Sequence, residues 1–233
     1  MRETARAFLA GADPAYLAGG AVYLFHRTAR LGTGSAHEEI SWSLSMTEKV
    51  NQISSTPVTL WSTFMSPGVN TLTWTTIVEN LSDLEATNDK LMTDNGYLML
   101  LEQGARYASE DAINDGLMQI LYADAAMDPA QPPAYVSAVD AVLAPGGYIH
   151  GIEVGIEIAQ RAEAITGVPV SFCVSNTGVY GAVSWFASYN SIDHVQQANE
   201  KLNGDMTFAQ FLDAETSKCY QPSATQQIYR RLA

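Results

Sequence analysis

The sequence predicts an α+β protein with two tandem ferredoxin-like β-α-β-β-α-β units, packed sheet to sheet into one barrel. Three observations predict this fold: an internal repeat, strand and helix patterns that recur in the same order in both halves, and a globular composition. Apolar residues make up 47% of the 233 residues and charged residues 16%, which suits a chain with a substantial core. We assign 1–20 to an N-terminal helix and loop, 21–126 to the first unit, 127–145 to a linker and 146–233 to the second unit.

The internal repeat relates most of one half to the other. Residue types that periodicity does not explain recur at an offset of 111: Trp74 with Trp185, Asn88 with Asn199, Lys90 with Lys201, and Asp94 with Asp205. The offset is 112 upstream, where Pro57 matches Pro169, and 108 near the ends, where Gln119 matches Gln227. A shared helical or strand period alone does not place Trp, Asn and Asp at matched positions, so we interpret the pattern as a duplication.

Residue patterns predict the elements of the first unit in order. The segment 21–31 is rich in Val, Tyr, Leu and Phe, as strands are, and 36–54 carries apolar residues at helical spacing. The segment 69–79 alternates apolar residues with threonine, so one face of that strand is apolar and the other polar. We therefore expect strands over 21–31, 57–64, 69–79 and 116–123, and helices over 36–54, from Ser82, and over 97–108.

The second unit is expected to repeat this order. We predict strands over 148–152, 168–174, 179–188 and 225–232, and helices over 154–166, 191–203 and 207–216. The proline-containing linker is expected to form one helical turn around 135–142, and a short helix is expected over 3–9. Each unit would leave one sheet face bare, and such a face has to be buried. Packing the two bare faces together would leave a barrel-like cavity.

The segment from Trp74 through Asn80-Leu81-Ser82-Asp83-Leu84, with Asp94 and Leu100-Leu101, resembles the dimeric α/β-barrel superfamily, and so does its counterpart from Trp185 to Asp193. That group includes antibiotic-biosynthesis monooxygenase-type and NIPSNAP-like proteins. The resemblance covers roughly 20–125 and 146–232, and it implies a tandem form in which one chain builds a barrel that most members build from two. It implies the fold more than the function, because this fold supports unrelated chemistries.

Two histidines are candidate catalytic residues. His26 and His150 each lie on the predicted first strand of a unit. If they face the barrel, either imidazole can act as a general base near neutral pH or bind haem or a metal. A histidine that is hydrogen-bonded in the core or at a strand edge is the open alternative. His37 and His194 are expected on helix surfaces.

The resemblance also implies substrate-binding residues, because oxygenase-like members often use a Trp, an Asn and an Arg in the cavity. Trp74 and Trp185 occupy matched positions, where they either pack the sheet against its helices or line the cavity. Asn70 and Arg27, or Arg30, are the nearest candidates for the other two roles. No metal site is predicted.

Composition restricts the partners. A net charge of −13 argues against binding to nucleic acid or to an anionic membrane, and no apolar run approaches the roughly 18 residues of a membrane span. The N-terminus lacks the pattern of a signal peptide. Cys173 and Cys219 form no disulfide framework, which favours free thiols and a cytoplasmic location. Nucleotide-binding, hydrolase and zinc-protease motifs are missing from the sequence.

Three functions remain open. The favoured one is a cofactor-independent oxygenase, cyclase or isomerase of secondary metabolism, acting on an aromatic or polyketide-like ligand in the barrel cavity with His26 or His150 as base. The second is a non-catalytic ligand-binding or assembly protein of the same fold. The third is a haem protein of the chlorite dismutase-like kind, with His150 or His194 as axial ligand. A small molecule is the expected partner, and free strand edges predict a homodimer.

Overall fold

The computed structural model describes residues 21–32, 36–66, 70–107, 113–123 and 132–233. The predicted helix over 3–9 and part of the predicted linker lie outside these residues. The first half of the chain forms β1 (Val22–Arg30), α2 (Ala36–Ile53), β2 (Thr59–Thr63), β3 (Thr71–Val78), α3 (Leu81–Leu91), α4 (Asn95–Gly104) and β4 (Ile113–Ala123). The second half forms β5 (Tyr135–Val142), α5 (Tyr148–Thr166), β6 (Val170–Ser175), β7 (Ala182–Tyr189), α6 (Ile192–Gly204), α7 (Met206–Cys219) and β8 (Thr225–Arg231).

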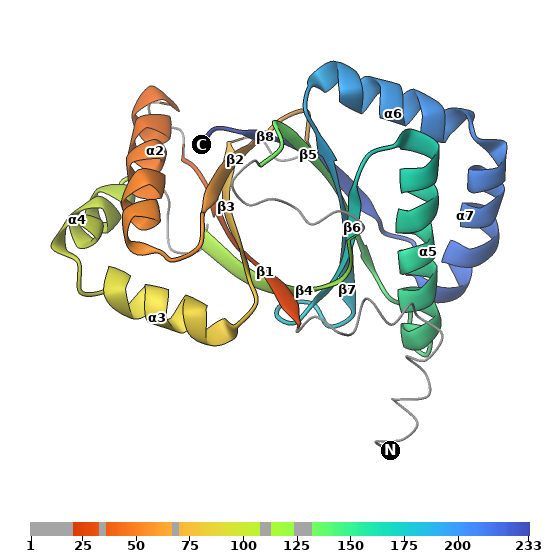
Figure 1. Cartoon of the computed structure of the whole chain (residues 1–233), viewed down its shortest axis with the longest axis horizontal. Coiled ribbons are helices and arrows are strands. Elements are labelled where there is room, and N and C mark those ends of the chain that lie inside the picture. The colour runs from red at the N-terminus through yellow and green to blue at the C-terminus, as the bar shows by residue number, and fades with distance from the viewer. Residues whose placement is uncertain (1–20, 33–35, 67–69, 108–112, 124–131) are drawn as a thin grey trace.

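The eight strands close into one antiparallel barrel in the order β1-β3-β2-β8-β5-β7-β6-β4. The first half supplies the run β4-β1-β3-β2 and the second half the run β8-β5-β7-β6, so both halves follow one order. They join where β2 pairs with β8 and β4 with β6. Helices α2, α3 and α4 cover one side of the barrel, and α5, α6 and α7 cover the other (Figure 1). The expected sheet-to-sheet closure is therefore present, as a continuous barrel.

The start of the second half was predicted wrongly. Residues 135–142, expected as a helical turn in the linker, form strand β5, whereas residues 148–152, expected as a strand, form the first turns of α5. The prolines before β5 masked it, and the short run Tyr148-Ile149 looks like a strand because a brief apolar run does not distinguish the two states. Gly146, with a φ of 82°, turns the chain between the two elements. The linker is consequently much shorter than 127–145.

The strand pairing tests the repeat position by position. Trp74 pairs with Leu60 and Arg27, and Trp185 pairs with Phe172 and Val139, so the offsets of 111 and 112 connect equivalent positions. The match of Gln119 with Gln227 is wrong, because Gln119 pairs with Tyr23 whereas its equivalent Arg230 pairs with Tyr135. The remaining predicted elements are present, with ends shifted by a few residues.

The barrel interior is polar over part of its surface. Phe25, Arg27 and Ala29 face the helices, so alternation along β1 turns His26 and Thr28 inward. Inside the barrel, the Trp61 indole donates to Thr75 Oγ1 at 2.8 Å and Ser184 Oγ donates to Asp140 Oδ1 at 2.5 Å. The threonine-rich face of β3 therefore looks into the barrel, and its apolar face packs against helices.

The apolar core lies between the sheet and the helices of each half. The larger cluster, in the second half, is built around residues such as Phe172, Val154 and Trp185, and the smaller one, in the first half, around Leu60 and Trp74. Cys173 and Cys219 are buried and free, as expected. In the described part of the chain, no helix is long and apolar enough to cross a membrane. Every described barrel strand has two neighbours, so the strand-edge argument for a homodimer loses its basis.

Candidate functional site

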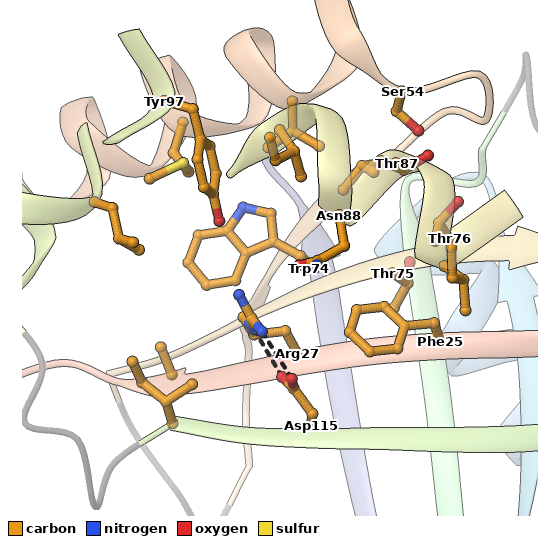
Figure 2. A pocket seen from close by; sticks show the side chains of 18 of the residues that line it. Phe25, Arg27, Ser54, Trp74, Thr75, Thr76, Thr87, Asn88, Tyr97 and Asp115 are labelled. Atoms are coloured by element: carbon orange, nitrogen blue, oxygen red, sulfur yellow. Dashed lines mark hydrogen bonds and ion pairs between the residues drawn. The ribbon is translucent and has the colours of Figure 1, made fainter. Parts of the chain in front are cut away.

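The first half contains a cavity of about 650 Å³ between the outer face of its sheet and helices α2, α3 and α4. We call it the N-half cavity (Figure 2). Its size suits a small organic molecule, since ligand sites usually measure ~300–1,000 Å³. The cavity lies on the face of the sheet opposite the barrel interior, where the ligand pocket was predicted, and side chains from β1, β3 and β4 form its floor.

An ion pair crosses the floor of this cavity. Arg27 Nε and Nη2 donate to the two carboxylate oxygens of Asp115, each at 2.7 Å. The two residues face each other directly across β1 and β4, so strand register alone fixes this two-point geometry. Hydrogen bonding to Asp115 raises the pKa of Arg27, against a smaller opposing effect of burial. The pair is half-buried and presents a cation and a carboxylate side by side to the cavity.

Trp74 forms an apolar wall beside the ion pair (Figure 2). Its indole Nε1 donates to Thr47 Oγ1 on α2 at 2.9 Å. Its ring meets the ring of Trp42 edge to face, with centroids 6.1 Å apart. Trp42 is held in turn, since its own Nε1 donates to the carbonyl oxygen of Leu100 on α4 at 2.7 Å. These contacts hold the Trp74 ring in one orientation, which gives a rigid aromatic surface for a flat ligand.

Tyr97 and Asn88 bring polar groups from the helices. Asp94 caps α4 by accepting the Tyr97 backbone N–H at 2.8 Å and is itself paired with Lys49 Nζ at 2.9 Å. This cap fixes Tyr97, which is 7% exposed and extends from α4 toward the floor (Figure 2). The Tyr97 hydroxyl contributes to the raised pKa of Arg27, which places it beside the guanidinium. Asn88 extends from α3 next to Trp74.

The structure separates the predicted substrate-binding residues. Arg27 and Trp74 line the N-half cavity, and Trp185 lines a different cavity in the second half. Asn70 lies outside both, exposed in the turn before β3 with a φ of 60°. Arg30 is exposed at the end of β1. The asparagine beside Trp74 is Asn88, not Asn70.

His26 lies on a strand, as predicted, but on the face opposite the N-half cavity. Its imidazole covers Gly116, where a Cβ atom would lie 2.0 Å from His26 Nε2. Burial lowers the pKa of His26, and the charges of Asp115 and Asp140 oppose this effect more weakly. The neutral imidazole is therefore favoured, in the barrel interior and behind the sheet that forms the floor of the cavity.

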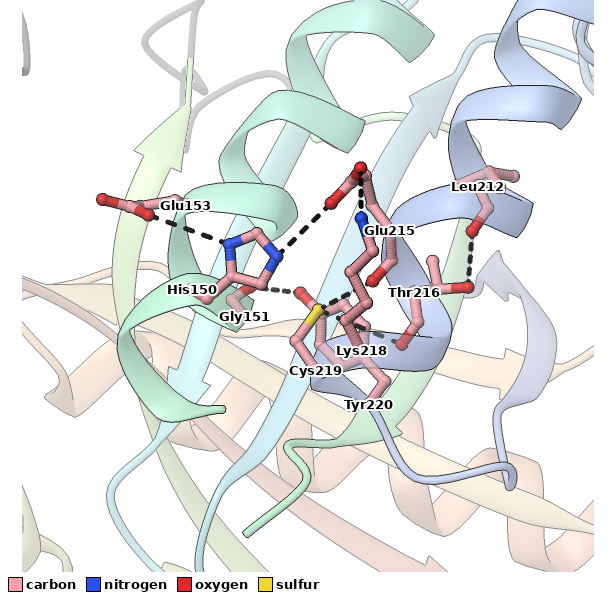
Figure 3. A network of polar contacts seen from close by, with 9 residues as sticks. All are labelled: His150, Gly151, Glu153, Leu212, Glu215, Thr216, Lys218, Cys219 and Tyr220. Atoms are coloured by element: carbon pink, nitrogen blue, oxygen red, sulfur yellow. Dashed lines mark hydrogen bonds and ion pairs between the residues drawn. The ribbon is translucent and has the colours of Figure 1, made fainter. Parts of the chain in front are cut away.

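His150 is on a helix surface and not on a strand (Figure 3). Its Nε2 lies 3.4 Å from a Glu215 carboxylate oxygen, and its Nδ1 lies 4.0 Å from a Glu153 oxygen. Lys218, and to a smaller extent His150, lower the pKa of Glu215. The imidazole is 46% exposed and connects the start of α5 to the end of α7. Of the two candidate histidines, His26 alone therefore lies on a strand that faces the barrel.

The second half has an equivalent cavity of about 1,080 Å³ between its sheet and helices α5, α6 and α7. We call it the C-half cavity. The same offsets relate their lining residues: Met46 to Ile158, Ser54 to Thr166, Trp74 to Trp185, Asn88 to Asn199, Leu91 to Leu202, and Leu101 to Leu212. Arg27 and Asp115 correspond to Val139 and Gln226, so the ion pair is present in the first half alone.

Three residues of the N-half cavity were missed as site residues. Asp115 fell outside the predicted last strand, which begins at Ile113 instead of residue 116. Its pairing with Arg27 depends on strand register, which the sequence does not show. Asn88 carried a usable signal, since a polar residue recurs at a helix position that faces the sheet in both halves. Tyr97 was recognised as helical, and only the packing of α4 brings it to Arg27.

The two axial-ligand candidates of the haem alternative lie away from both cavities. That alternative requires His150 or His194 as axial ligand, and neither lines either cavity. His194 lies on α6 and packs edge-on against Tyr189, with ring centroids 5.7 Å apart. In the described part of the chain, no group of three or more His, Cys, Asp or Glu side chains is arranged to hold a metal ion.

Comparison with solved structures defines the class of fold. A “Putative monooxygenase” from Fusobacterium nucleatum superposes with a TM-score of 0.69 at 10% identity, covering 92% of this chain and 94% of that one. An anthrone oxidase-like protein superposes with a TM-score of 0.63 at 10% identity, covering 91% of this chain and 92% of that one. A “Putative Chlorite dismutase” superposes with a TM-score of 0.56 at 12% identity, covering 92% of this chain and 96% of that one.

These neighbours share the fold of the dimeric α/β-barrel superfamily, so the chain has that fold, within a single polypeptide. No family model matches the sequence, and no curated protein matches it either. At 10–12% identity the likeness covers the fold alone, and the function has to be argued from the cavities.

Proposed function

We propose that the chain is a cofactor-independent oxygenase acting on an aromatic, polyketide-like molecule bound in the N-half cavity. The observation that carries this proposal is the composition of that cavity: a fixed tryptophan wall beside an arginine–carboxylate pair, with Tyr97 and Asn88 converging from the helices. An apolar cavity with a few convergent polar groups is the usual form of a small-molecule site. Neighbours described as monooxygenase and anthrone oxidase-like support the same class.

The ion pair supplies the chemistry that such a reaction needs. A substrate with an activated C–H group beside a carbonyl transfers its proton to the Asp115 carboxylate. The Arg27 guanidinium and the Tyr97 hydroxyl stabilise the negative charge that develops on the substrate oxygen. The resulting carbanion reduces O₂ to a carbon-bound peroxide, which takes the proton back from Asp115. The hydroperoxide formed in this way loses water and leaves a new carbonyl group. One O₂ is consumed and one water released for each CH₂ converted to C=O.

Trp74 and Asn88 orient the substrate in this proposal. The Trp74 ring offers a flat surface for an aromatic ligand, and the Asn88 carboxamide can donate to a ring oxygen and accept from a ring hydroxyl. His26 takes no part, because it lies behind the sheet, and neither does His150 on its helix surface. A cyclase or isomerase would use the same proton transfer without O₂.

We also propose that the chain is a tandem form of its superfamily, in which a duplicated ferredoxin-like unit replaces the two subunits of a dimer. The common strand order of the two halves and the offsets of 111 and 112 between the lining residues of their cavities support this origin.

The test is oxygen uptake by the purified protein with anthrone as substrate, in the presence of a chelator and without added flavin or haem. We expect O₂ consumption and formation of the quinone. The blocking variant Asn88→Trp, which fills the N-half cavity, should abolish turnover. Its matched control is Asn199→Trp at the equivalent position of the C-half cavity, which should leave turnover unchanged.

If wild-type protein consumes no O₂ with anthrone or with a series of hydroxylated aromatic ketones, the oxygenase is excluded. Conversion of those ketones without O₂ uptake would identify the cyclase or isomerase instead.

A further inference from the structure

We propose that the C-half cavity is a second ligand site, which binds an uncharged, predominantly apolar aromatic molecule. It is a separate cavity, formed by different helices on the other side of the barrel (Figure 1). The proposal does not depend on the function assigned to the N-half cavity, because the two cavities have no lining residue in common.

The charge of the walls defines the ligand. Arg27, Asp115 and Glu85 line the N-half cavity, whereas none of the residues that line the C-half cavity is charged. The equivalents of the ion pair are Val139 and Gln226. A charged ligand group buried there would find no opposite charge on the walls, and burying an unpaired charge is costly. An uncharged molecule avoids that cost.

Most polar groups on these walls already bond within the protein. The Trp185 indole donates to the Gly155 carbonyl oxygen at 2.8 Å, and the Tyr220 hydroxyl donates to the Gly151 carbonyl oxygen. Thr166 Oγ1 donates to the Ala162 carbonyl oxygen at 2.6 Å, and the Tyr189 hydroxyl lies 3.3 Å from Ser137 Oγ. These walls consequently offer ring faces and methyl groups to a ligand.

The aromatic surface of the cavity is held in place from behind. The ring of Trp185 contacts two others: the Phe172 ring, with centroids 5.2 Å apart, and, edge to face, the Tyr220 ring, with centroids 5.5 Å apart. Phe172 is fully buried and Trp185 is 8% exposed. A fixed indole costs little conformational entropy when a flat ligand stacks on it, which favours an aromatic ligand over a flexible chain.

Asn199 is the polar group in position to orient such a molecule. It lies on α6 at the place that Asn88 occupies in the first half. Lys201 reaches the Thr166 end of the cavity, where its ammonium donates to the Thr166 carbonyl oxygen at 3.1 Å. This contact directs the cation toward the protein backbone. The expected ligand therefore has one hydroxyl or carbonyl group on an apolar ring system.

The neutral fluorophore N-phenyl-1-naphthylamine serves as the probe in a fluorescence titration of the full chain. We expect saturable binding to wild-type protein. Asn199→Trp, which fills the C-half cavity, should weaken binding about tenfold or more, whereas Asn88→Trp should leave it within about twofold. Thermal unfolding of each variant checks that it remains folded.

A variant that introduces an ion pair into the C-half cavity tests whether its ligand is uncharged. Val139→Arg combined with Gln226→Asp places the ion pair of the first half in the C-half cavity and should also weaken probe binding. The proposal is overturned if wild-type protein does not bind the probe, if Asn88→Trp and not Asn199→Trp abolishes binding, or if the anionic 1-naphthalenesulfonate binds the same site as tightly. Turnover and probe binding respond to opposite blocking variants, so failure of one proposal is distinguishable from failure of the other.

Discussion

The two halves of the molecule place equivalent cavities on equivalent elements and give them different chemistry. The helix positions that line them are mostly conserved in character, as Leu91 and Leu202 or Leu101 and Leu212 show. The floors differ, because the first half has Arg27 and Asp115 where the second has Val139 and Gln226. The helices therefore contribute similar apolar residues to both cavities, and two paired strand positions decide whether the floor carries an ion pair.

The two halves also differ on the side of the sheet that faces the barrel interior. In the first half Gly116 leaves room for the His26 imidazole, and its equivalent in the second half, Gln227, pairs with Ala138. The second half instead carries Asp140, which accepts from Ser184 at 2.5 Å. Charge is thus distributed differently in the two halves on both sides of the sheet. Changes at equivalent positions can test whether this difference has functional meaning.

The largest expected effect comes from removing the ion pair of the N-half cavity. Arg27→Val combined with Asp115→Gln gives this floor the residues of the second half. We expect kcat/KM for the oxygenase reaction to fall about 10²–10³-fold, because the donor that stabilises the developing oxyanion is lost. The fold should persist, since a half-exposed ion pair contributes only ~0–1 kcal/mol to stability. The measurement is initial-rate oxygen uptake.

Val139→Ala is the matched control for that double variant, at the position equivalent to Arg27. It should keep kcat/KM within about twofold, since distant sites act independently. Equal losses in both variants would mean that the ion pair has no special part in turnover.

Much of the fold could be predicted from the sequence because the internal repeat indicated the same elements, in the same order, in both halves. Residues such as Asp94 and Asp205 recur for a local physical reason: each caps the helix that follows, accepting the backbone N–H of Tyr97 or Phe208. The strand β5 was missed because its small residues and the prolines before it give a weak signal, and its pairing with β7 and β8 is what defines it. Tertiary pairing here overrides local preference.

Less of the site could be predicted. Trp74 was named from its matched position and Arg27 from the arginine that the family resemblance implies. The face that each occupies depends on strand register, and one residue of register reverses it. Asp115 lies 88 positions from Arg27 in sequence, and no local pattern relates the two. His150 was placed in the barrel because its strand was predicted wrongly, which shows that a site prediction inherits every error of the element that carries it.

A smaller effect, on folding stability, is expected when a closely packed glycine of each half is replaced by alanine. A Cβ atom at Gly155 would lie 2.3 Å from Phe172 Cζ, and one at Gly104 would lie 2.3 Å from Trp42 Cζ2. Phe172 is fully buried beside Trp185, whereas Trp42 is partly exposed. Gly155→Ala should therefore destabilise the protein by about 1–3 kcal/mol, and Gly104→Ala should cost less because the partly exposed Trp42 can shift toward solvent at the expense of its hydrogen bond to Leu100.

Urea unfolding of the two variants measures this difference. Gly155 lies in a helix interior, where alanine gains about 1 kcal/mol of helix propensity, whereas Gly104 is the last residue of α4 and gains less. A greater loss of stability in Gly155→Ala would therefore reflect the steric effect. A Gly104→Ala variant less stable than Gly155→Ala would show that Trp42 is as tightly held as Phe172. It would also indicate a rigid N-half cavity.

The smallest expected effect is on the pH dependence of folding stability, and it compares His26 with His150. Burial lowers the pKa of His26 in the folded state below its value in the unfolded chain, so the unfolded chain binds the proton more readily. The stability that results is complete above about pH 6.5, the usual pKa of histidine, and is lost as the pH falls toward the folded-state value. Urea unfolding of His26→Gln between pH 7.5 and 5, values chosen to bracket about 6.5, should show a weaker pH dependence than wild type. His150→Gln, at the exposed surface near Glu215, is measured alongside for comparison with the wild-type slope. If His26→Gln retains that slope while His150→Gln loses it, the pH dependence originates at the helix surface and the barrel interior does not control it.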